Sequence, residues 1–173
     1  MNILICYAST EGQTRKIAQF CASQLIAHGH SVEVIAAKDA TEVAIELFDA
    51  AILAGSIHMG HLQAELSGFA SEHAQALNHV PTLFLQVSLA IAGGDSDDIA
   101  HLDVIAGEFC KAAGWTPGAT HQIAGAFRFT EYDFFKSWAM RWIAASKGQA
   151  VDPKGDTEFT DWNALSTILE DWP

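Results

Sequence analysis

A short segment near the start of the chain combines hydroxyl groups and a glycine in a pattern that suits phosphate binding. Residues Ile3 to Tyr7 are mostly apolar and β-prone, as expected of a strand buried on both faces. Ser9 and Thr10 follow with hydroxyl groups. Gly12 allows a tight turn, and Thr14 stands where a helix should begin. Such a loop directs backbone N–H groups and the positive end of a helix dipole at one point. We therefore interpret 9–14 as a phosphate-binding loop.

Two common nucleotide motifs are missing from this loop. It contains no G-x-G-x-x-G pattern, and no Gly-Lys-Ser/Thr follows, so nucleoside triphosphates are disfavoured. No Lys or Arg precedes Arg15 in the loop, so dipoles rather than a charged side chain would hold the phosphate. The alternative is that the Ser and Thr residues only cap the first helix.

The segment Ser9-Thr-Glu-Gly-Gln-Thr14, placed after an N-terminal strand, resembles the FMN-phosphate loop of the flavodoxin superfamily. The resemblance implies FMN as the cofactor. It also implies that the loops after the third and fourth strands contact the flavin. The cofactor-binding residues expected from it are Ser9, Thr10, Glu11, Gly12, Gln13, Thr14, Ser56, Ile57, His58, Met59, Gly60, Ser88, Leu89 and Ala90.

Apolar strands alternate with amphipathic helices, which predicts an α/β fold built from βαβ units with a parallel sheet. We expect a flavodoxin-like three-layer sandwich, with five strands in the order 2-1-3-4-5 and the ligand beyond the carboxyl ends of strands one and three. After the first strand, the expected strands are 31–37, 49–55, 81–88 and 122–127. A short helical or loop crossover is expected at 43–48, and helices at 12–28, 62–77, about 99–113 and 162–172, the last capped by Thr160 or Asp161.

Length and composition indicate one cytoplasmic globular domain covering 1–173. Half of the residues are hydrophobic and 17% are charged. No apolar run reaches the roughly 20 residues of a membrane span, and the first strand leads directly into the phosphate loop, which excludes a signal peptide. Cys6, Cys21 and Cys110 have no C-x-x-C spacing, so we expect buried thiols. The net charge of −12 argues against a nucleic acid partner.

The loop after the third strand, 55–61, begins the part expected to meet the flavin ring. Gly55 and Gly60 should let it approach a flat ring closely, and the superfamily places His58 and Met59 nearest that ring. His58 and His61 could also form an H-x-x-H metal pair. Because no further ligand stands at a telling spacing, we expect no metal. The acidic run 95–98 is interpreted as the N-terminal cap and first turn of the next helix.

A closer resemblance rests on four segments, in order: 55–61, Ile123-Ala-Gly-Ala-Phe-Arg-Phe129, an aromatic-rich helix around 133–147, and Phe159-Thr-Asp-Trp162. Together they resemble the flavodoxin-type, quinone-dependent protoporphyrinogen oxidases of bacteria over essentially the whole chain. The resemblance implies dehydrogenation of protoporphyrinogen IX, in haem biosynthesis, with electrons passed to a membrane quinone. It also implies that 128–158 is a family-type helical insertion before the C-terminal helix.

Residues 128–147 carry four basic and two acidic side chains, a net charge of +2 in an acidic chain. At about 100° per residue, Phe134, Phe135, Trp138 and Trp142 fall within one arc of a helix. The arc could face a quinone or the inner surface of the cell membrane, with 132–147 as a peripheral contact. It could equally pack on the sheet as ordinary core.

Catalytic residues are less clearly indicated than the phosphate loop. His58 is the titratable group expected near the ring, and Arg128, after the fifth strand, could meet a substrate carboxylate. The acidic 95–98 stretch stands where the relatives are rich in Lys and Arg, and it would repel propionates. The other functions considered are a flavodoxin-type electron carrier between proteins and an FMN-dependent quinone reductase. No second nucleotide motif supports the reductase.

Overall fold

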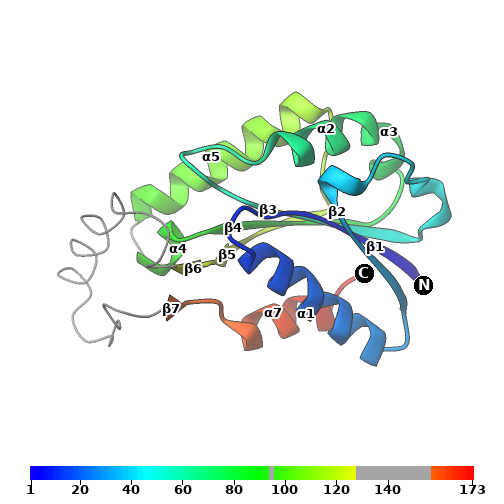
Figure 1. The fold of residues 1–173 in the computed structure, drawn as a ribbon, viewed down its shortest axis with the longest axis horizontal. Helices are drawn as coiled ribbons and strands as arrows, with labels where there is room; N and C mark the ends of the chain where they lie inside the picture. Colours follow the sequence, from blue (N-terminus) through cyan, green and yellow to red (C-terminus); the bar gives the residue numbers. More distant parts are fainter. Residues whose placement is uncertain (94–95, 128–156) are drawn as a thin grey trace.

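The computed structural model describes residues 1–93, 96–127 and 157–173. Helices cover both faces of a five-stranded parallel sheet, giving three layers (Figure 1). The strand order is β2-β1-β3-β4-β5, which confirms the predicted fold and topology. In this part of the chain, none of the helices is both long and apolar enough to cross a bilayer.

The strands are buried most completely at the centre of the sheet. β1 (Asn2–Ala8) lies between β2 (Ser31–Ala36) and β3 (Ala50–Ser56), and β4 (Thr82–Ser88) separates β3 from β5 (Ala119–Ala124). Every residue of β4 is buried, including the polar Thr82, Gln86 and Ser88, as expected of a central strand in a sheet covered on both faces. The residues of the outer strand β2 are exposed or half-buried, and none of them is fully buried.

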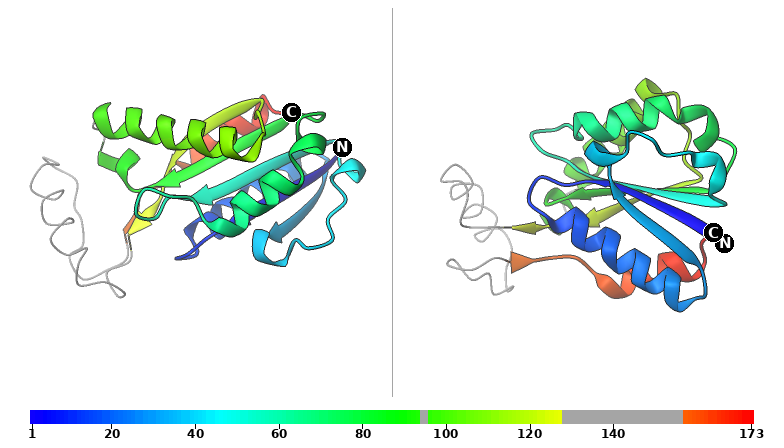
Figure 2. Two further views of the ribbon diagram at one scale, coloured as in Figure 1. Left: turned by 90° about the horizontal axis from the view of Figure 1, so that it is seen from above. Right: turned by 45° about the vertical axis from the view of Figure 1, so that its right-hand side comes forward.

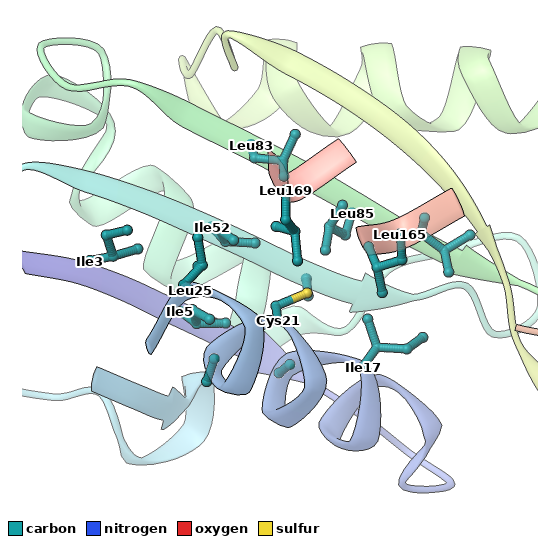
Figure 3. Packing of buried hydrophobic residues seen from close by; sticks show 14 of the residues in the cluster. Ile3, Ile5, Ile17, Cys21, Leu25, Ile52, Leu83, Leu85, Leu165 and Leu169 are labelled. Carbon is teal, nitrogen blue, oxygen red and sulfur yellow. The ribbon is translucent and has the colours of Figure 1, made fainter. Parts of the chain in front are cut away.

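Helices on the two faces bury opposite sides of each strand. On one face, α1 (Gln13–Ala27) and α7 (Trp162–Glu170) pack on a cluster that includes Ile3 and Ile5 of β1 and Leu83 and Leu85 of β4 (Figure 3). On the other, α2 (Ala64–Glu72) and α5 (Ser96–Ala113) pack over Leu4 and Cys6. The right-hand view of Figure 2 shows the two helical layers on opposite sides of the sheet. The short elements are η1 (Ala37–Asp39), η2 (Ile45–Leu47), α3 (Ala74–Leu77) and α4 (Ala90–Gly93).

The helix expected over 62–77 is divided into α2 and α3 in the structure. The backbone N–H of His73 donates to the carbonyl of Phe69 at 3.1 Å, and that of Leu77 donates to the carbonyl of His73 at 2.9 Å. Hydrogen bonds of the helical type therefore continue across the junction, and the division is a local distortion at His73. α2 starts two residues later than expected because Gln63 has an extended backbone, with ψ of 141°.

The fifth strand begins and ends three residues earlier than the predicted 122–127. Its register is set by β4, since Leu83 pairs with Ala119 and Ser88 pairs with Ala124. The next residues form a separate antiparallel ribbon of β6 (Ala126–Phe127) and β7 (Thr157–Glu158). The strand β7 of this ribbon comprises the last two residues of 128–158, the segment that the family resemblance implied to be a helical insertion.

The three cysteines are free thiols, and burial raises the pKa of each of them. Cys6 and Cys21 are fully buried, and desolvation raises the pKa of each to about 12. Cys110 is half-buried, and desolvation raises its pKa to about 11. The expectation of buried thiols is confirmed for Cys6 and Cys21 and holds partly for Cys110.

Candidate functional site

The carboxyl ends of β1 and β3 bring two loops together at one edge of the sheet. Ala8, the last residue of β1, pairs with Gly55 in β3, so Ser9 and Ser56 follow at neighbouring positions. From there β1 leads to α1 on one face, and β3 leads to α2 on the other. This is the topological switch point of the sheet, where ligands of open α/β folds bind.

The segment 9–14, called the phosphate-type loop from here on, leads into α1 through Gly12, whose backbone is in the left-handed region. Gly12 has φ of 90°, a value that favours glycine, and its N–H donates to Ser9 Oγ at 2.9 Å. No described side chain caps α1, and its first turn contains no acidic residue. The N-cap position of α1 is therefore occupied by a glycine and not by one of the Ser or Thr residues of 9–14. The first N–H groups of a helix have no partner within the helix, so those of α1 remain available to an anion.

Thr14 provides a direct test of whether this loop suits a phosphate. Its side chain is buried, with 1% exposure, and Oγ1 has no hydrogen-bond partner among the described residues. An unsatisfied buried hydroxyl costs about 1–3 kcal/mol. A phosphate oxygen accepting from this hydroxyl would remove that cost. The loop therefore fits a cofactor that carries a phosphate.

The Gln13 side chain turns away from the loop towards the C-terminal segment. Its Nε2 donates to Thr160 Oγ1 at 2.9 Å, and the Thr160 hydroxyl donates to the Ala124 carbonyl at 2.7 Å. Thr160 is therefore used as a tether, and Asp161 caps α7 by accepting from the N–H groups of Asn163 and Ala164. What Gln13 retains for a ligand is its backbone N–H at the start of α1.

Lys16, one turn into α1, is already paired. Its ammonium contacts the Glu158 carboxylate and lies 5.2 Å from the centroid of the Trp162 ring. Trp162 Nε1 donates to Glu158 at 2.7 Å. Partial burial alone would raise the pKa of the Glu158 carboxyl, but the hydrogen bonds from Lys16 and Trp162 outweigh it and hold that pKa below its ordinary value.

The loop after β3 closes as a tight hairpin. The backbones of His58 and His61 exchange both hydrogen bonds, at 2.9 and 3.1 Å. The two residues between them have positive φ, 50° at Met59 and 82° at Gly60, as in a type I′ turn. Met59 is 86% exposed at the tip, and His58 is half-buried.

Gly55 has a different role from the one expected. A Cβ at this position would lie 2.5 Å from Leu66 Cδ2 and 2.8 Å from Leu62 Cδ2. The space next to Gly55 is therefore filled by side chains that precede and begin α2, and the glycine serves helix–sheet packing rather than close approach to a ring. Gly60 serves the turn through its positive φ.

Gln63 joins the two loops, and the sequence analysis did not identify it. Its Nε2 donates to Thr10 Oγ1 at 3.1 Å and also contacts Ser56 Oγ. Its Oε1 is buried and has no partner in the described part of the chain. The sequence predicted Gln63 to lie in the first turn of the helix 62–77, where Gln is an ordinary helical residue, so it did not stand out.

The loop after β4 begins with a local turn. Ser88 is buried, and its Oγ accepts from the N–H of Ala90 at 3.1 Å. Leu89 and Ala90 are half-buried beside it. Asp97 and Asp98 occupy the first turn of α5, as expected from the 95–98 run, whereas residues 94–95 lie outside the described residues.

Two sets of predicted residues cannot be placed. Arg128 and the aromatic segment 132–147 lie outside the described residues, as does most of the predicted insertion. Within the described ranges, no three His, Cys, Asp or Glu side chains gather as they would around a metal ion. The His58 and His61 pair is joined through its backbones.

Curated proteins match over nearly the full chain. Protoporphyrinogen IX dehydrogenase (quinone) of Escherichia coli is 28% identical over 171 residues, which cover 99% of this chain and 94% of that protein. The protein of the same name from Leishmania major is 26% identical over 170 residues, which cover 98% of this chain and 73% of that protein. These matches confirm the resemblance inferred from the four sequence segments.

Solved structures and a family model agree on the fold. A flavodoxin from Streptococcus pneumonia superposes with a TM-score of 0.59 at 18% identity, covering 99% of this chain and 97% of that one, and at this identity the likeness shows the fold alone. The model described as "Flavodoxin domain" matches residues 4–154, most of the chain. The chain therefore belongs to the flavodoxin domain family, and FMN is its cofactor.

Proposed function

We propose that this chain is an FMN-dependent protoporphyrinogen IX dehydrogenase that passes electrons to a membrane quinone. The observation that carries the proposal is the similarity, over 99% of the chain, to the E. coli protein of that activity. The geometry of the phosphate-type loop supports it, because this loop suits the phosphate of FMN. The proposed function is therefore an oxidoreductase of haem biosynthesis.

In this proposal, the three loops at the carboxyl edge of the sheet hold FMN. The first N–H groups of α1 and the hydroxyl of Thr14 bind the phosphate. Ser9 keeps the loop in shape by accepting from Gly12. Residues 56–60 and 88–90 flank the ring. When bound, FMN supplies the redox chemistry, accepting electrons from the porphyrinogen and giving them to the quinone.

Two side chains are proposed to act on the substrate side. His58, half-buried in the β3–α2 loop, is the imidazole best placed to exchange a proton near the ring. Arg128, which follows β6 in the sequence, is proposed to pair with a porphyrinogen carboxylate. Replacing Arg128 with Gln should then raise KM for the porphyrinogen and leave the affinity for FMN unchanged.

We further propose that the protein is cytoplasmic and contacts the inner face of the cell membrane through 132–147. Aromatic residues with flanking cations favour such a contact, and a membrane quinone requires access to the bilayer. Alanine at Trp138 and Trp142 should abolish sedimentation with liposomes while thermal unfolding stays cooperative. Variants that merely unfold would show that these side chains belong to the core.

The experiment that tests the proposed function is anaerobic spectroscopy of the purified protein. A flavin spectrum should bleach on mixing with protoporphyrinogen IX and return on addition of menaquinone or ubiquinone. Heat-denatured protein with the same amount of FMN is the control for free flavin. A flavin that stays oxidised with the porphyrinogen would refute the dehydrogenase proposal.

A second candidate is a flavodoxin-type carrier that moves electrons between proteins. The net charge of −12 favours it, since acidic surfaces steer such proteins to basic partners. In that case the flavin would ignore the porphyrinogen and cycle with a flavodoxin reductase. The same spectroscopic experiment, with the reductase added last, separates the two functions.

A further inference from the structure

The side chain of Gln63 connects the loop after β1 with the end of β3 through hydrogen bonds. It precedes α2, and its amide nitrogen donates to Thr10 Oγ1 in the β1–α1 loop at 3.1 Å. The same nitrogen contacts Ser56 Oγ at the end of β3. Because Ala8 and Gly55 are paired, both hydroxyls lie at the switch point of the sheet. One amide thus sets the orientation of two hydroxyl groups.

The direction of these hydrogen bonds decides what the hydroxyls can do next. An amide nitrogen only donates, so each hydroxyl accepts from Gln63 and keeps its own hydrogen for another acceptor. Thr10 is exposed and Ser56 is half-buried, so neither hydroxyl is enclosed by protein. The arrangement suits a ligand that offers acceptors, such as phosphate oxygens or ring carbonyls, and the loop itself contains no cation before Arg15.

The carbonyl oxygen of the same amide shows that this orientation of Gln63 costs free energy. Gln63 Oε1 is buried without a described partner, and it lies 3.6 Å from the place a Cβ of Gly55 would occupy. A buried carbonyl oxygen without a hydrogen bond is unfavourable. Both N–H groups of the amide, in contrast, are used. The side chain therefore donates two hydrogen bonds through its nitrogen, while its oxygen accepts none from the described residues.

We propose that Gln63 is a positioning residue for the cofactor: it holds the Thr10 and Ser56 hydroxyls as donors directed at FMN. The inference rests on the proposed FMN site, and it adds a residue that acts through two others. The hydroxyl donors then compensate for the missing basic side chain in the phosphate-type loop.

The test compares two substitutions that remove the donor in different ways. Gln63→Met keeps a long, unbranched side chain without N–H groups, and it should weaken FMN binding about tenfold by leaving both hydroxyls unoriented. Gln63→Glu places acceptors against the hydroxyls, which then donate to the carboxylate instead of to FMN. It should weaken binding at least about tenfold more than Gln63→Met, and the penalty should be smaller for riboflavin, which lacks the phosphate.

Binding is measured by quenching of flavin fluorescence on titration into the apo-protein. Gln75→Glu is the matched control, because Gln75 is exposed on α3 and the change adds the same charge. It should alter the affinity for FMN less than about twofold. Thermal unfolding of each apo-protein establishes that the variants are folded.

The possible results distinguish a failure of the role proposed for Gln63 from a failure of the proposed FMN site as a whole. Wild-type protein that fails to bind FMN would overturn the proposed function itself. Wild-type binding with an unchanged Gln63→Glu variant, or equal losses in Gln63→Glu and Gln63→Met, would overturn only the orienting role. If both variants unfold, Thr10→Val combined with Ser56→Ala removes the oriented hydroxyls directly. That double variant should bind FMN at least about tenfold more weakly, and unchanged affinity would refute the inference.

Discussion

Replacing Thr14 with valine should change stability and cofactor binding in opposite directions. The Thr14 hydroxyl is buried and unpartnered among the described residues, so it costs the apo-protein about 1–3 kcal/mol. Valine has nearly the same shape and a similar helix propensity. We expect the apo-protein to gain about 1 kcal/mol, which raises Tm by roughly 2–4 °C for a chain of this size.

The same substitution removes the hydroxyl that we propose as a donor to the FMN phosphate. A hydrogen bond to a charged group contributes about 1.5–3 kcal/mol, so FMN should bind about ten- to a hundredfold more weakly. The assay is thermal unfolding of the apo-protein, followed by fluorescence titration with FMN. The prediction holds only if the same Thr14→Val variant shows both the higher Tm of the apo-protein and the weaker binding of FMN.

A second buried threonine provides the control. Thr82 is 2% exposed at the start of β4, and its hydroxyl accepts from the N–H of Gly118 at 3.2 Å. Thr82→Val leaves that N–H without its partner and should lower Tm, with FMN affinity unchanged. A Thr14→Val protein that unfolds earlier than wild type and binds FMN equally well would refute the reasoning, because its hydroxyl would then be satisfied within the protein.

Three further outcomes follow from packing and charge. Gly55→Ala should cost about 1–3 kcal/mol by overpacking against Leu62 and Leu66, whereas Gly68→Ala, with open space around it in α2, should stabilise by up to about 1 kcal/mol; denaturant unfolding compares them. Because the pKa of Glu158 is lowered, its pair with Lys16 should stabilise above the ordinary value of 4.5 and lose that effect as pH falls through the lowered pKa. The pair is largely exposed, so Glu158→Gln should cost less than about 1 kcal/mol at pH 7, and a difference from wild type that persists in acid would contradict this. A thiol reagent at pH 8 should label Cys110 first, with the two fully buried cysteines reacting only on unfolding, and mass spectrometry would detect any earlier labelling.

The sequence was sufficient for the sheet because its signals are local and repeated. Apolar runs such as Ile3 to Tyr7 and 81–88 are what strands buried on both faces require, and the alternation with helices specifies parallel connections. Boundaries were less predictable. β5 was displaced by three residues because its ends are set by pairing with β4, and pairing between distant segments leaves no local mark in the sequence.

Site residues were predictable in proportion to their chemical distinctiveness. The loop 9–14 stood out through hydroxyls and glycine, and the structure adds that Gly12 rather than a side chain begins α1. Gln63 could not have been found, because its role depends on Thr10, which lies 53 positions away in the sequence. The packing role of Gly55 was missed because its neighbours, Leu62 and Leu66, approach it only in the folded chain.

The Thr-Asp-Trp segment, which helped to narrow the family resemblance, has a structural explanation for each of its residues. Thr160 joins Gln13 at the start of α1 to the end of β5, and Asp161 caps α7. Trp162 packs on Phe20 of α1, with ring centroids 4.8 Å apart. The contacts of Thr160 and Trp162 fasten the C-terminal helix to α1, the helix that follows the phosphate-type loop, while Asp161 fixes the start of α7 itself. Similarity at this segment is therefore evidence for a shared cofactor scaffold, and the choice of porphyrinogen as substrate must be tested at other residues.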